Sequence, residues 1–448
     1  MALLSSPKGC FSSFNLSYSP SRGTTAIAHA VGLQNISLLI ALVRCSTCQV
    51  AFLFSGRYIL VSIDWYWRRP TCELFRKSMT TRLEHSTPTL TFNNNTEFQA
   101  ALRRRIDDYF RQTGRPRRGN WQIYLKAFIL LSCFFFSYLA LVFVATDIWE
   151  GMLFAVLLAL SMTGIGFNLM HDGGHRAFSE HRWINRLAAM TLDLIGASSY
   201  VWHWKHAMFH HNYVNITGHD PDIDLGIFAR FAPHQKRLPF HRWQHLYIWV
   251  LYALLVFKFH FYSDFHHVIT GRIHTNRMPR PKGRDLAIFV GGKVLFVVLA
   301  FALPLRYHPL SAVLFYYAVV VLIMGLPISV VFQLPHCTGR ADHPLPDATL
   351  AMKNPWAVHQ AEVTLDFDRH SPIRTWFFGG LNFHLEHHLF PSICHINYPG
   401  MSKIVEETCR EFGVKYAEHR SFWTGLREHY RWLREMGRPS FSNGPHQH

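Results

Sequence analysis

Residues 376–391 read Trp-Phe-Phe-Gly-Gly-Leu-Asn-Phe-His-Leu-Glu-His-His-Leu-Phe-Pro and contain three closely spaced histidines. His384, His387 and His388 stand at positions i, i+3 and i+4, so on a helix their imidazoles project from one face. Imidazole binds iron, zinc and copper, so the histidines alone do not name the element. The spacing predicts a metal site on a short helix.

Two earlier groups of histidines have similar spacing, one an i, i+4 pair and the other an i, i+4, i+5 set. Adjacent residues on a helix point about 100° apart, so His210 and His211 should face two different ions, as should His387 and His388. Nine nitrogen ligands suit a two-metal centre with open positions. The candidates are His171 and His175, then His206, His210 and His211, then His336 after the apolar run 323–334, and finally His384, His387 and His388.

The number of histidines calls for an alternative interpretation, because the chain has 30 of them. A single histidine is more often a surface residue or a satisfied core residue than a ligand. Chance can make one such group in a histidine-rich chain, but hardly three in order. Other dense histidines lack the repeated spacing and are not assigned, namely His234, His241, His245, His266 and His267.

The composition indicates a membrane protein, with 49% hydrophobic and 15% aromatic residues and only 16% charged ones in 448 residues. Four apolar runs are long enough to span a bilayer, residues 121–146, 151–170, 286–305 and 312–334. The net charge is +17, and 14 Lys or Arg lie between residues 171 and 285, which marks this section as cytoplasmic. No motif for binding nucleic acid is visible.

The four spans form two helical hairpins that return to the same side of the membrane. Residues 183–204 are expected to form an interfacial helix. Residues 245–264 are apolar enough to insert, but a crossing there would place the third histidine group opposite the first, so we expect an in-plane or re-entrant helix. The predicted fold is all-α, a polytopic membrane protein of two transmembrane hairpins with a cytoplasmic helical cap that carries the histidines.

The first 78 residues differ from the rest. They contain eight Lys or Arg and two acids, a composition typical of a transit peptide. We favour a natural start at Met79, in which case residues 1–78 are a leader or an overextended reading frame. Cys45 and Cys48 could be a metal or redox pair, whereas the cysteines after residue 78 are scattered singly and fit a reducing compartment. Residues 79–120 are expected to be a polar cytoplasmic arm, residues 121–408 the membrane domain and residues 409–448 a basic cytoplasmic tail.

The three histidine groups, with Gly-Gly-Leu-Asn before the last and Leu-Phe-Pro after it, resemble those of the membrane fatty acid desaturases. The resemblance runs from about Leu90 to about Thr408 and is strongest to the acyl-lipid and linoleoyl-CoA (delta-6-like, front-end) branch. It implies a diiron centre that uses O2 and two external electrons to place a cis double bond in an acyl chain, carried by a lipid or by CoA.

The resemblance also bears on auxiliary residues. Related acyl-CoA desaturases hold a water on one iron with an asparagine, for which Asn382 or Gln333 could substitute here, although Asn382 could equally be a helix N-cap. Many front-end members have Gln where this chain has His384. Carboxylates that could orient the imidazoles are Asp172, Asp220, Asp222, Asp224 and Glu386.

Many front-end members also carry a fused cytochrome b5 domain with a His-Pro-Gly-Gly motif, which this sequence lacks. We therefore expect a separate electron donor, either an acidic ferredoxin or a free cytochrome b5, steered by the basic surface. The histidines should lie on the cytoplasmic, or stromal, side.

Two other functions are considered. A diiron hydroxylase or ketolase would use the same scaffold, and spacing does not distinguish it. A histidine-rich metal transporter would need ionisable residues within the spans, where only Lys126 and Lys293 occur.

Overall fold

In the computed structural model, the described residues are 48–54, 57–63, 90–93 and 97–439. The chain divides into two units, Met1–His85 and Ser86–His448. In the first unit, β1 (Cys48–Phe54) and β2 (Arg57–Ile63) form an antiparallel hairpin. Most of the expected leader, the favoured start at Met79 and the partner of Cys48 in the suggested metal or redox pair lie outside the described residues.

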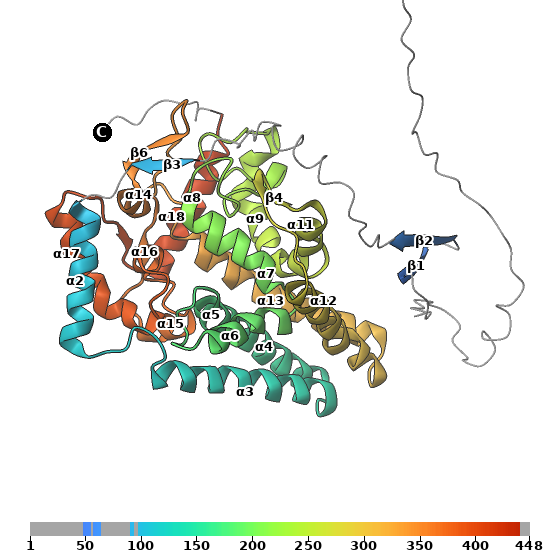
Figure 1. The fold of residues 1–448 in the computed structure, drawn as a ribbon. Helices are drawn as coiled ribbons and strands as arrows, with labels where there is room; N and C mark the ends of the chain where they lie inside the picture. The colour runs from blue at the N-terminus through green and yellow to red at the C-terminus, as the bar shows by residue number, and fades with distance from the viewer. Residues whose placement is uncertain (1–47, 55–56, 64–89, 94–96, 440–448) are drawn as a thin grey trace, which may run out of the picture. The chain divides into compact units, whose positions relative to one another are not determined.

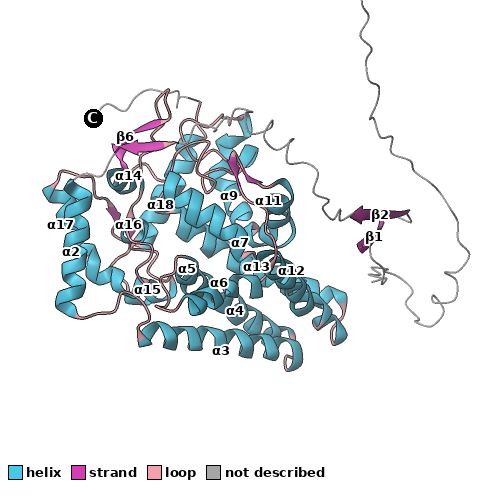
Figure 2. Ribbon diagram, in the orientation of Figure 1, coloured by secondary structure: helices cyan, strands magenta, loops and turns pink. Residues whose placement is uncertain are grey.

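The second unit contains four helices long and apolar enough to cross a membrane, as the sequence predicts (Figures 1 and 2). They are Trp121–Phe143 (α3), Ile148–Gly174 (α4, Ile148–Ile165, with its continuation), Arg284–Arg306 (α12, Arg284–Val297, with its continuation) and Leu310–Gln333 (α13). Asp147 begins the second helix, since its carboxylate accepts the amides of Trp149 (2.8 Å) and Glu150 (2.9 Å). The protein is therefore a multi-pass membrane protein.

The first predicted interfacial helix is not continuous. The structure has α6 (Arg182–Leu194), a turn, then α7 (Ser199–Trp202), which continues as the π-helix η2 (His203–His210) and α8 (His211–Tyr213). At the turn, Gly196 has φ +99°, and a Cβ there would come within 2.5 Å of Phe296. Ser198 then caps the new helix by accepting the Val201 amide (3.3 Å). Glycine and a capping serine thus split the predicted helix 183–204.

The second ambiguous segment is sharply bent. It comprises η4 (Pro239–Trp243), α9 (Gln244–Ala253), α10 (Leu255–Lys258), the π-helix η5 (Phe259–Ser263) and α11 (Asp264–Thr270). The chain bends by 58° between Pro239–Ala253 and Leu255–Thr270. This geometry suits a re-entrant loop or a broken span. Gly325 of α13 lets the bend approach closely, because a Cβ there would overlap the Ala253 carbonyl oxygen.

Further helices cover the end of the spans at which α5 (His171–Gly174) and the end of α13 lie. They include α2 (Glu97–Thr113), α14 (Trp356–Val363), α15 (Pro372–Phe377), α16 (His384–Leu389), α17 (Tyr398–Glu411) and α18 (Phe422–Met436). The second unit also has three two-stranded ladders among its described residues: β3 (Thr91–Asn93) with β6 (Ala351–Pro355), β4 (Arg272–Ile273) with β5 (Asn276–Arg277), and β7 (Asp366–Phe367) with β8 (Glu418–His419). The described chain is predominantly helical, as predicted, apart from these short ladders and the β1–β2 hairpin.

The core of the second unit consists of separate apolar clusters. One fills the space between α3, α4, α6 and α13, and a second joins α9 and α13 to α18. A third lies between α2, α14, α16 and α17. The second cluster packs around the end of α13, before His336, and the third holds α16, which carries the last three candidate histidines.

Candidate metal centre

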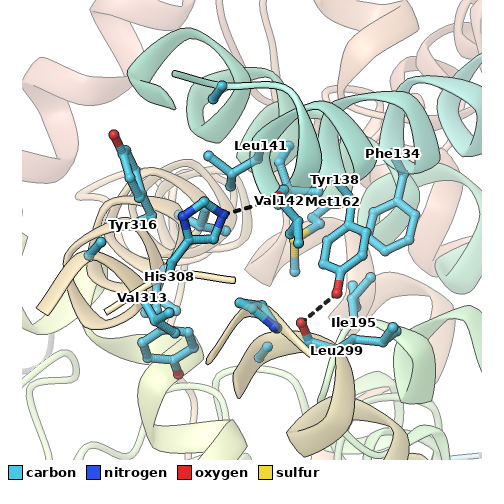
Figure 3. Close-up of a pocket in the computed structure, with 18 of the residues that line it drawn as sticks. Phe134, Tyr138, Leu141, Val142, Met162, Ile195, Leu299, His308, Val313 and Tyr316 are labelled. Atoms are coloured by element: carbon cyan, nitrogen blue, oxygen red, sulfur yellow. Dashed lines mark hydrogen bonds between the residues drawn. The ribbon is translucent and has the colours of Figure 1, made fainter. Parts of the chain in front are cut away.

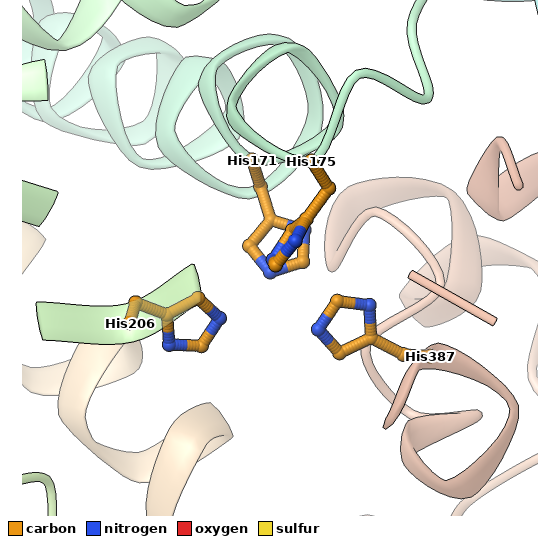
Figure 4. Close-up of side chains that lie close together, drawn as sticks. All are labelled: His171, His175, His206 and His387. Carbon is orange, nitrogen blue, oxygen red and sulfur yellow. The ribbon is translucent and has the colours of Figure 1, made fainter. Parts of the chain in front are cut away.

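The nine candidate histidines converge from four separate regions of the chain. Eight of them form two sets of four, and within each set the potential ligand atoms all lie within 4.8 Å of one another. The ninth residue lies between the two sets. Group A is His171, His175, His206 and His387; group B is His210, His336, His384 and His388; the ninth residue is His211. Figure 4 shows the rings of group A pointing toward one another.

His211 links the two groups. Its Nε2 lies 3.3 Å from Nε2 of His206 and 3.0 Å from Nε2 of His387, both in group A. Its ring also stacks on that of His388 in group B, with 4.4 Å between centroids. The adjacent histidines His387 and His388 fall in different groups, in accordance with their divergent directions on a helix.

Two π-helices shape the centre, and neither was foreseen from the sequence. One, η1 (Gly166–Met170), leads directly into α5 (His171–Gly174), and the other is η2. A π-helix bonds residue i to i+5, which brings residues five apart toward the same face. This explains how His206 and His211, five positions apart, bring their Nε2 atoms together.

The glycines of the first and third groups allow close packing. A Cβ on Gly173 would lie 2.5 Å from the backbone nitrogen of Ala189, and one on Gly174 would overlap the indole of Trp202. Gly379 has φ +62°, and a Cβ there would overlap the carbonyl oxygen of Phe167. Gly173 and Gly379 thus each permit a close approach to a neighbouring backbone, whereas Gly174 makes room for a side chain.

Most of the rings are held through Nδ1. The Nδ1 atom of His210 lies 3.0 Å from Asp220, and that of His206 lies 3.5 Å from Asp222. The remaining Nδ1 contacts are those of His336 with the Val363 carbonyl (3.2 Å), His384 with the Leu381 carbonyl (2.9 Å), His387 with the Tyr398 hydroxyl (3.3 Å) and His388 with the Gln360 amide oxygen (3.0 Å). Such partners fix the tautomer and the ring direction.

The inward-facing nitrogens are the strongest sign of a metal. Among the described residues, no hydrogen-bond partner exists for Nε2 of His171, His175, His336, His384 or His388. Buried polar atoms are normally satisfied, so this number of unpaired nitrogens at one place requires an occupant. Because these donors are neutral imidazoles aimed at common points, the residues fit metal ions.

The protonation state of the rings agrees with this interpretation. Burial lowers the pKa of His384 to about 3 and that of His206 to about 4, and it lowers the pKa of His388 well below the usual value. His210 is an exception, because burial lowers its pKa but the Asp220 and Asp222 carboxylates outweigh burial and raise it. Neutral imidazoles can act as ligands, and the carboxylates increase the basicity of His210.

The predicted carboxylates separate into two kinds. Asp220 and Asp222 lie beside the second histidine group, and Asp222 also pairs with Lys205. Asp224 instead pairs with His274 at 3.0 Å. His274 is not a candidate ligand, so this ion pair does not connect Asp224 to the candidate metal centre.

Asp172 and Glu386 also contact groups other than the candidate imidazoles. Asp172 accepts from Nδ1 of His395 at 2.8 Å and from Sγ of Cys394 at 3.1 Å. Glu386 forms no hydrogen bond to an imidazole within the described chain. Burial, followed by the neighbouring Asp366 carboxyl, raises the pKa of Glu386 well above its usual range.

Asn382 and Gln333 each keep one unpaired oxygen in the described part of the protein. The Asn382 amide nitrogen donates to Thr375 Oγ1 (2.9 Å), and that of Gln333 donates to the Asp222 carbonyl (3.0 Å). Asn382 is not the N-cap of α16, because the Asp366 carboxylate accepts the Leu385 amide at 2.9 Å instead.

An apolar cavity of about 350 Å³ lies among the four spans (Figure 3). It is lined from both hairpin turns, at Asp147 and His308, as far as Met162 and Ile195. Two of its polar groups are bonded to backbone, since Tyr138 donates to the Leu299 carbonyl and His308 to the Val142 carbonyl, both at 2.7 Å. The Tyr317 hydroxyl is paired with Nδ1 of His260 at 2.9 Å. The cavity therefore presents mainly hydrocarbon to an occupant.

The fold and the centre together define a class, a multi-pass helical membrane protein with a buried nine-imidazole site that fits two metal ions. A family model for fatty acid desaturases matches residues 147–420, and this chain belongs to that family.

Its relatives agree with this assignment. The chain is 35% identical over 353 residues to the sn-1 linoleoyl-lipid 6-desaturase of Arthrospira platensis, covering 78% of this chain and 95% of the relative. It is 34% identical over 351 residues to the enzyme of the same name from Synechocystis sp., covering 78% and 98%. It is also 34% identical over 355 residues to the acyl-lipid (8-3)-desaturase of Physcomitrium patens, covering 78% and 73%.

The protein is thus a membrane-bound fatty acid desaturase, an oxidoreductase that introduces a double bond into an acyl chain. These relatives do not favour the hydroxylase, ketolase or transporter hypotheses. Members of this family generally contain two irons, and the histidine groups found here could hold them. Sequence reasoning missed Gln360 and Tyr398, which lie outside the histidine groups and meet them only in the fold.

Proposed function

We propose that groups A and B each bind an iron ion and that the centre desaturates an acyl chain esterified in a membrane lipid. The observation that carries this proposal is the set of unpaired Nε2 atoms aimed into one buried space. The names of the relatives from Arthrospira and Synechocystis make position 6 of a lipid-bound linoleoyl chain the first to test.

The reaction needs a strong oxidant, because a saturated C–H bond has neither an acidic proton nor a leaving group. Bound iron supplies this oxidising power from O2. In the overall balance, one O2, two electrons and two protons combine with two hydrogens from adjacent carbons to give two waters and one double bond. The protein's own residues contribute orientation and the exclusion of water.

Two aromatic side chains are suited to excluding water from the centre. The Trp202 ring lies 4.8 Å from that of His206 and 5.7 Å from that of His171. The Phe332 ring lies 5.5 Å from His206 in group A and 6.5 Å from His384 in group B. Both aromatic side chains are half-buried beside rings that are almost all fully buried, so we assign them as the apolar wall against which the acyl chain lies.

We assign the cavity among the spans to the methyl-terminal part of the acyl chain. Its walls are apolar, and it lies between helices that cross the bilayer, so a lipid tail could enter without passing through water. The polar groups of Tyr138 and His308 are already bonded to backbone carbonyls, so a hydrocarbon occupant would leave none of them unpaired.

Asn382 is proposed to hold a water on one iron. Asn382 stands two residues before His384 of group B in the sequence. Its side-chain nitrogen donates to Thr375, and its side-chain oxygen has no hydrogen-bond partner among the described residues. Gln333, with its own unpaired oxygen one turn before His336, is the alternative. Asp220 and Asp222 are proposed to orient His210 and His206.

We also propose that the histidine groups lie on the cytoplasmic or stromal side and receive electrons from a separate ferredoxin or free cytochrome b5. The net charge of +17 supports both parts, since basic loops remain on that side and an acidic donor would be attracted to them.

The test is to express the full chain in a host that lacks this activity, supply linoleate and analyse lipid-bound and free acyl groups by mass spectrometry. We expect a new cis double bond in lipid-bound chains and none with His388→Ala. A protein that retains two irons but leaves the lipids unchanged would overturn the proposal. A hydroxylated product would instead identify a hydroxylase.

A further inference from the structure

Three arginines surround a hollow in the loop that follows α11. The hollow is lined by Arg272, Arg277 and Arg280 together with Thr270, Gly271, Met278 and Pro279. Arg272 pairs directly with Arg277 in the β4–β5 ladder, so their side chains leave the same face of the hairpin. Like charges placed directly opposite each other are destabilising, which indicates that a counter-charge belongs in this place.

The described part of the chain does not supply that counter-charge. None of its ion pairs includes Arg272, Arg277 or Arg280. The acids near this loop in sequence or through contacts are used elsewhere, Asp224 with His274 at 3.0 Å and Asp285 with Arg186 at 2.9 Å. The three guanidinium groups are therefore available to an external anion.

The third arginine is already held in position. Arg280 Nη2 donates to the Ile269 carbonyl at 2.8 Å, which fixes the side chain across the loop. Gly271, with φ +65°, makes the turn beneath it, and a Cβ there would lie 3.5 Å from Nε of Arg280. A guanidinium group fixed in this way loses less freedom when it binds a phosphate.

The hollow lies in the loop that leads into a candidate membrane span. The span that follows begins at Arg284, four residues after Arg280. Large apolar side chains are exposed on the helices that flank this loop in the chain, Ile269 by 70% and Leu286 by 43%. Trp183 is exposed by 65% on α6, which the Arg186–Asp285 pair ties to the start of α12. This combination of exposed apolar side chains and unpaired arginines is typical of a lipid-headgroup site.

The loop is also tied to the helix of the second histidine group. The Tyr200 hydroxyl donates to the Pro279 carbonyl at 2.8 Å, and Ile273 and Met278 are buried against Val201. The side-chain amide of Asn276 donates to the His219 carbonyl at 2.8 Å. An anion bound by this loop would therefore steady the segment that carries His206.

We propose that the hollow formed by Arg272, Arg277 and Arg280 binds the phosphate-bearing headgroup of an anionic membrane lipid. Lipid is favoured over an acidic protein because the hollow adjoins the start of a span and exposed apolar side chains. The arginine fork suits phosphate oxygens, which it can engage through two parallel hydrogen bonds.

The test measures the melting temperature of the full-length protein in detergent with dihexanoylphosphatidate, dihexanoylphosphatidylcholine or inorganic phosphate. We expect phosphatidate to raise the melting temperature more than either of the others. The Arg272→Gln/Arg277→Gln variant should bind phosphatidate about tenfold more weakly or worse. The matched control is Arg103→Gln/Arg104→Gln, which removes two exposed charges from α2 and should bind normally.

The single variant Arg272→Gln adds a second test, in which the substitution should not lower the melting temperature of the lipid-free protein. Without lipid, Arg272→Gln should melt at the same or a higher temperature, because it removes a like-charge pair. A lower melting temperature with an unchanged response to phosphatidate would overturn the proposal. An equal response to inorganic phosphate or to phosphatidylcholine would also overturn it. The absence of a phosphatidate response, together with slower reduction of the double variant by ferredoxin, would assign the loop to a protein partner instead.

Discussion

The Asp220→Asn substitution tests how the centre is held. Both carboxylate oxygens face Nδ1 of His210, at 3.0 and 3.2 Å, and they also accept the amides of Asn215 (2.9 Å) and Asp222 (2.8 Å). Asparagine keeps the shape but removes the charge that makes His210 more basic. Loss of such a partner typically weakens metal binding by about 10–100-fold, or about 1.4–2.8 kcal/mol.

The assay is iron content per chain after dialysis against graded chelator concentrations, followed by acyl-chain analysis. Asp224→Asn is the matched control, because Asp224 lies in the same loop but pairs with His274 rather than with a candidate ligand. We expect Asp220→Asn to lose iron at lower chelator concentrations and Asp224→Asn to match the wild type. Equal iron retention in both folded variants would refute the assigned role of Asp220.

Three further predictions concern stability and substrate length. Gly379→Ala should destabilise the protein more than Gly413→Ala. Both glycines have positive φ, where an alanine costs about 1–2 kcal/mol, but only at Gly379 would the added Cβ clash with a neighbour. Comparable losses in melting temperature would argue against the clash. Burial lowers the pKa of His429 to about 4, below its value in the unfolded chain. The stability that the neutral His429 side chain contributes is therefore complete above about pH 6.5 and is lost as the pH falls toward 4. His429→Gln should make the melting temperature depend less on pH in this range. Ala300→Phe, which fills the cavity among the spans, should reduce the length of the longest acyl chain that the protein accepts. Ala302→Phe, on the exposed side of the same helix, should leave this length unchanged. The assay is product analysis with acyl chains of graded length.

Much of the architecture could be predicted because it depends on local patterns. The four spans are uninterrupted apolar runs, and Asp147 marks the turn between two of them. The histidine groups were recognisable because each is contiguous in sequence. His336 could be predicted from its position directly after an apolar run, and its ring lies 4.9 Å from that of His210.

Other features depend on contacts that no local pattern encodes. Residues 203–210 form a π-helix, although the sequence there reads like an ordinary helix. The close approach of Phe296, a hundred residues later, to Gly196 at the break in the predicted helix 183–204 is likewise visible only in the fold. Gln360 meets His388 only through the packing of α14 on α16.

Asp172 illustrates a different limit. Its place beside His171 suggests a contact with a ligand, yet its carboxylate is directed to His395, whose Nε2 lies 2.9 Å from the buried Lys126 amine. Adjacent residues on a helix point in different directions, so sequence proximity to a ligand does not establish contact with it.

The central claim is that two iron ions occupy the two histidine groups. It is tested most directly by an experimental structure of the iron-loaded protein with anomalous scattering data collected at the iron absorption edge. We predict two iron peaks, one among His171, His175, His206 and His387 and the other among His210, His336, His384 and His388. A single peak, or peaks outside these groups, would contradict the account.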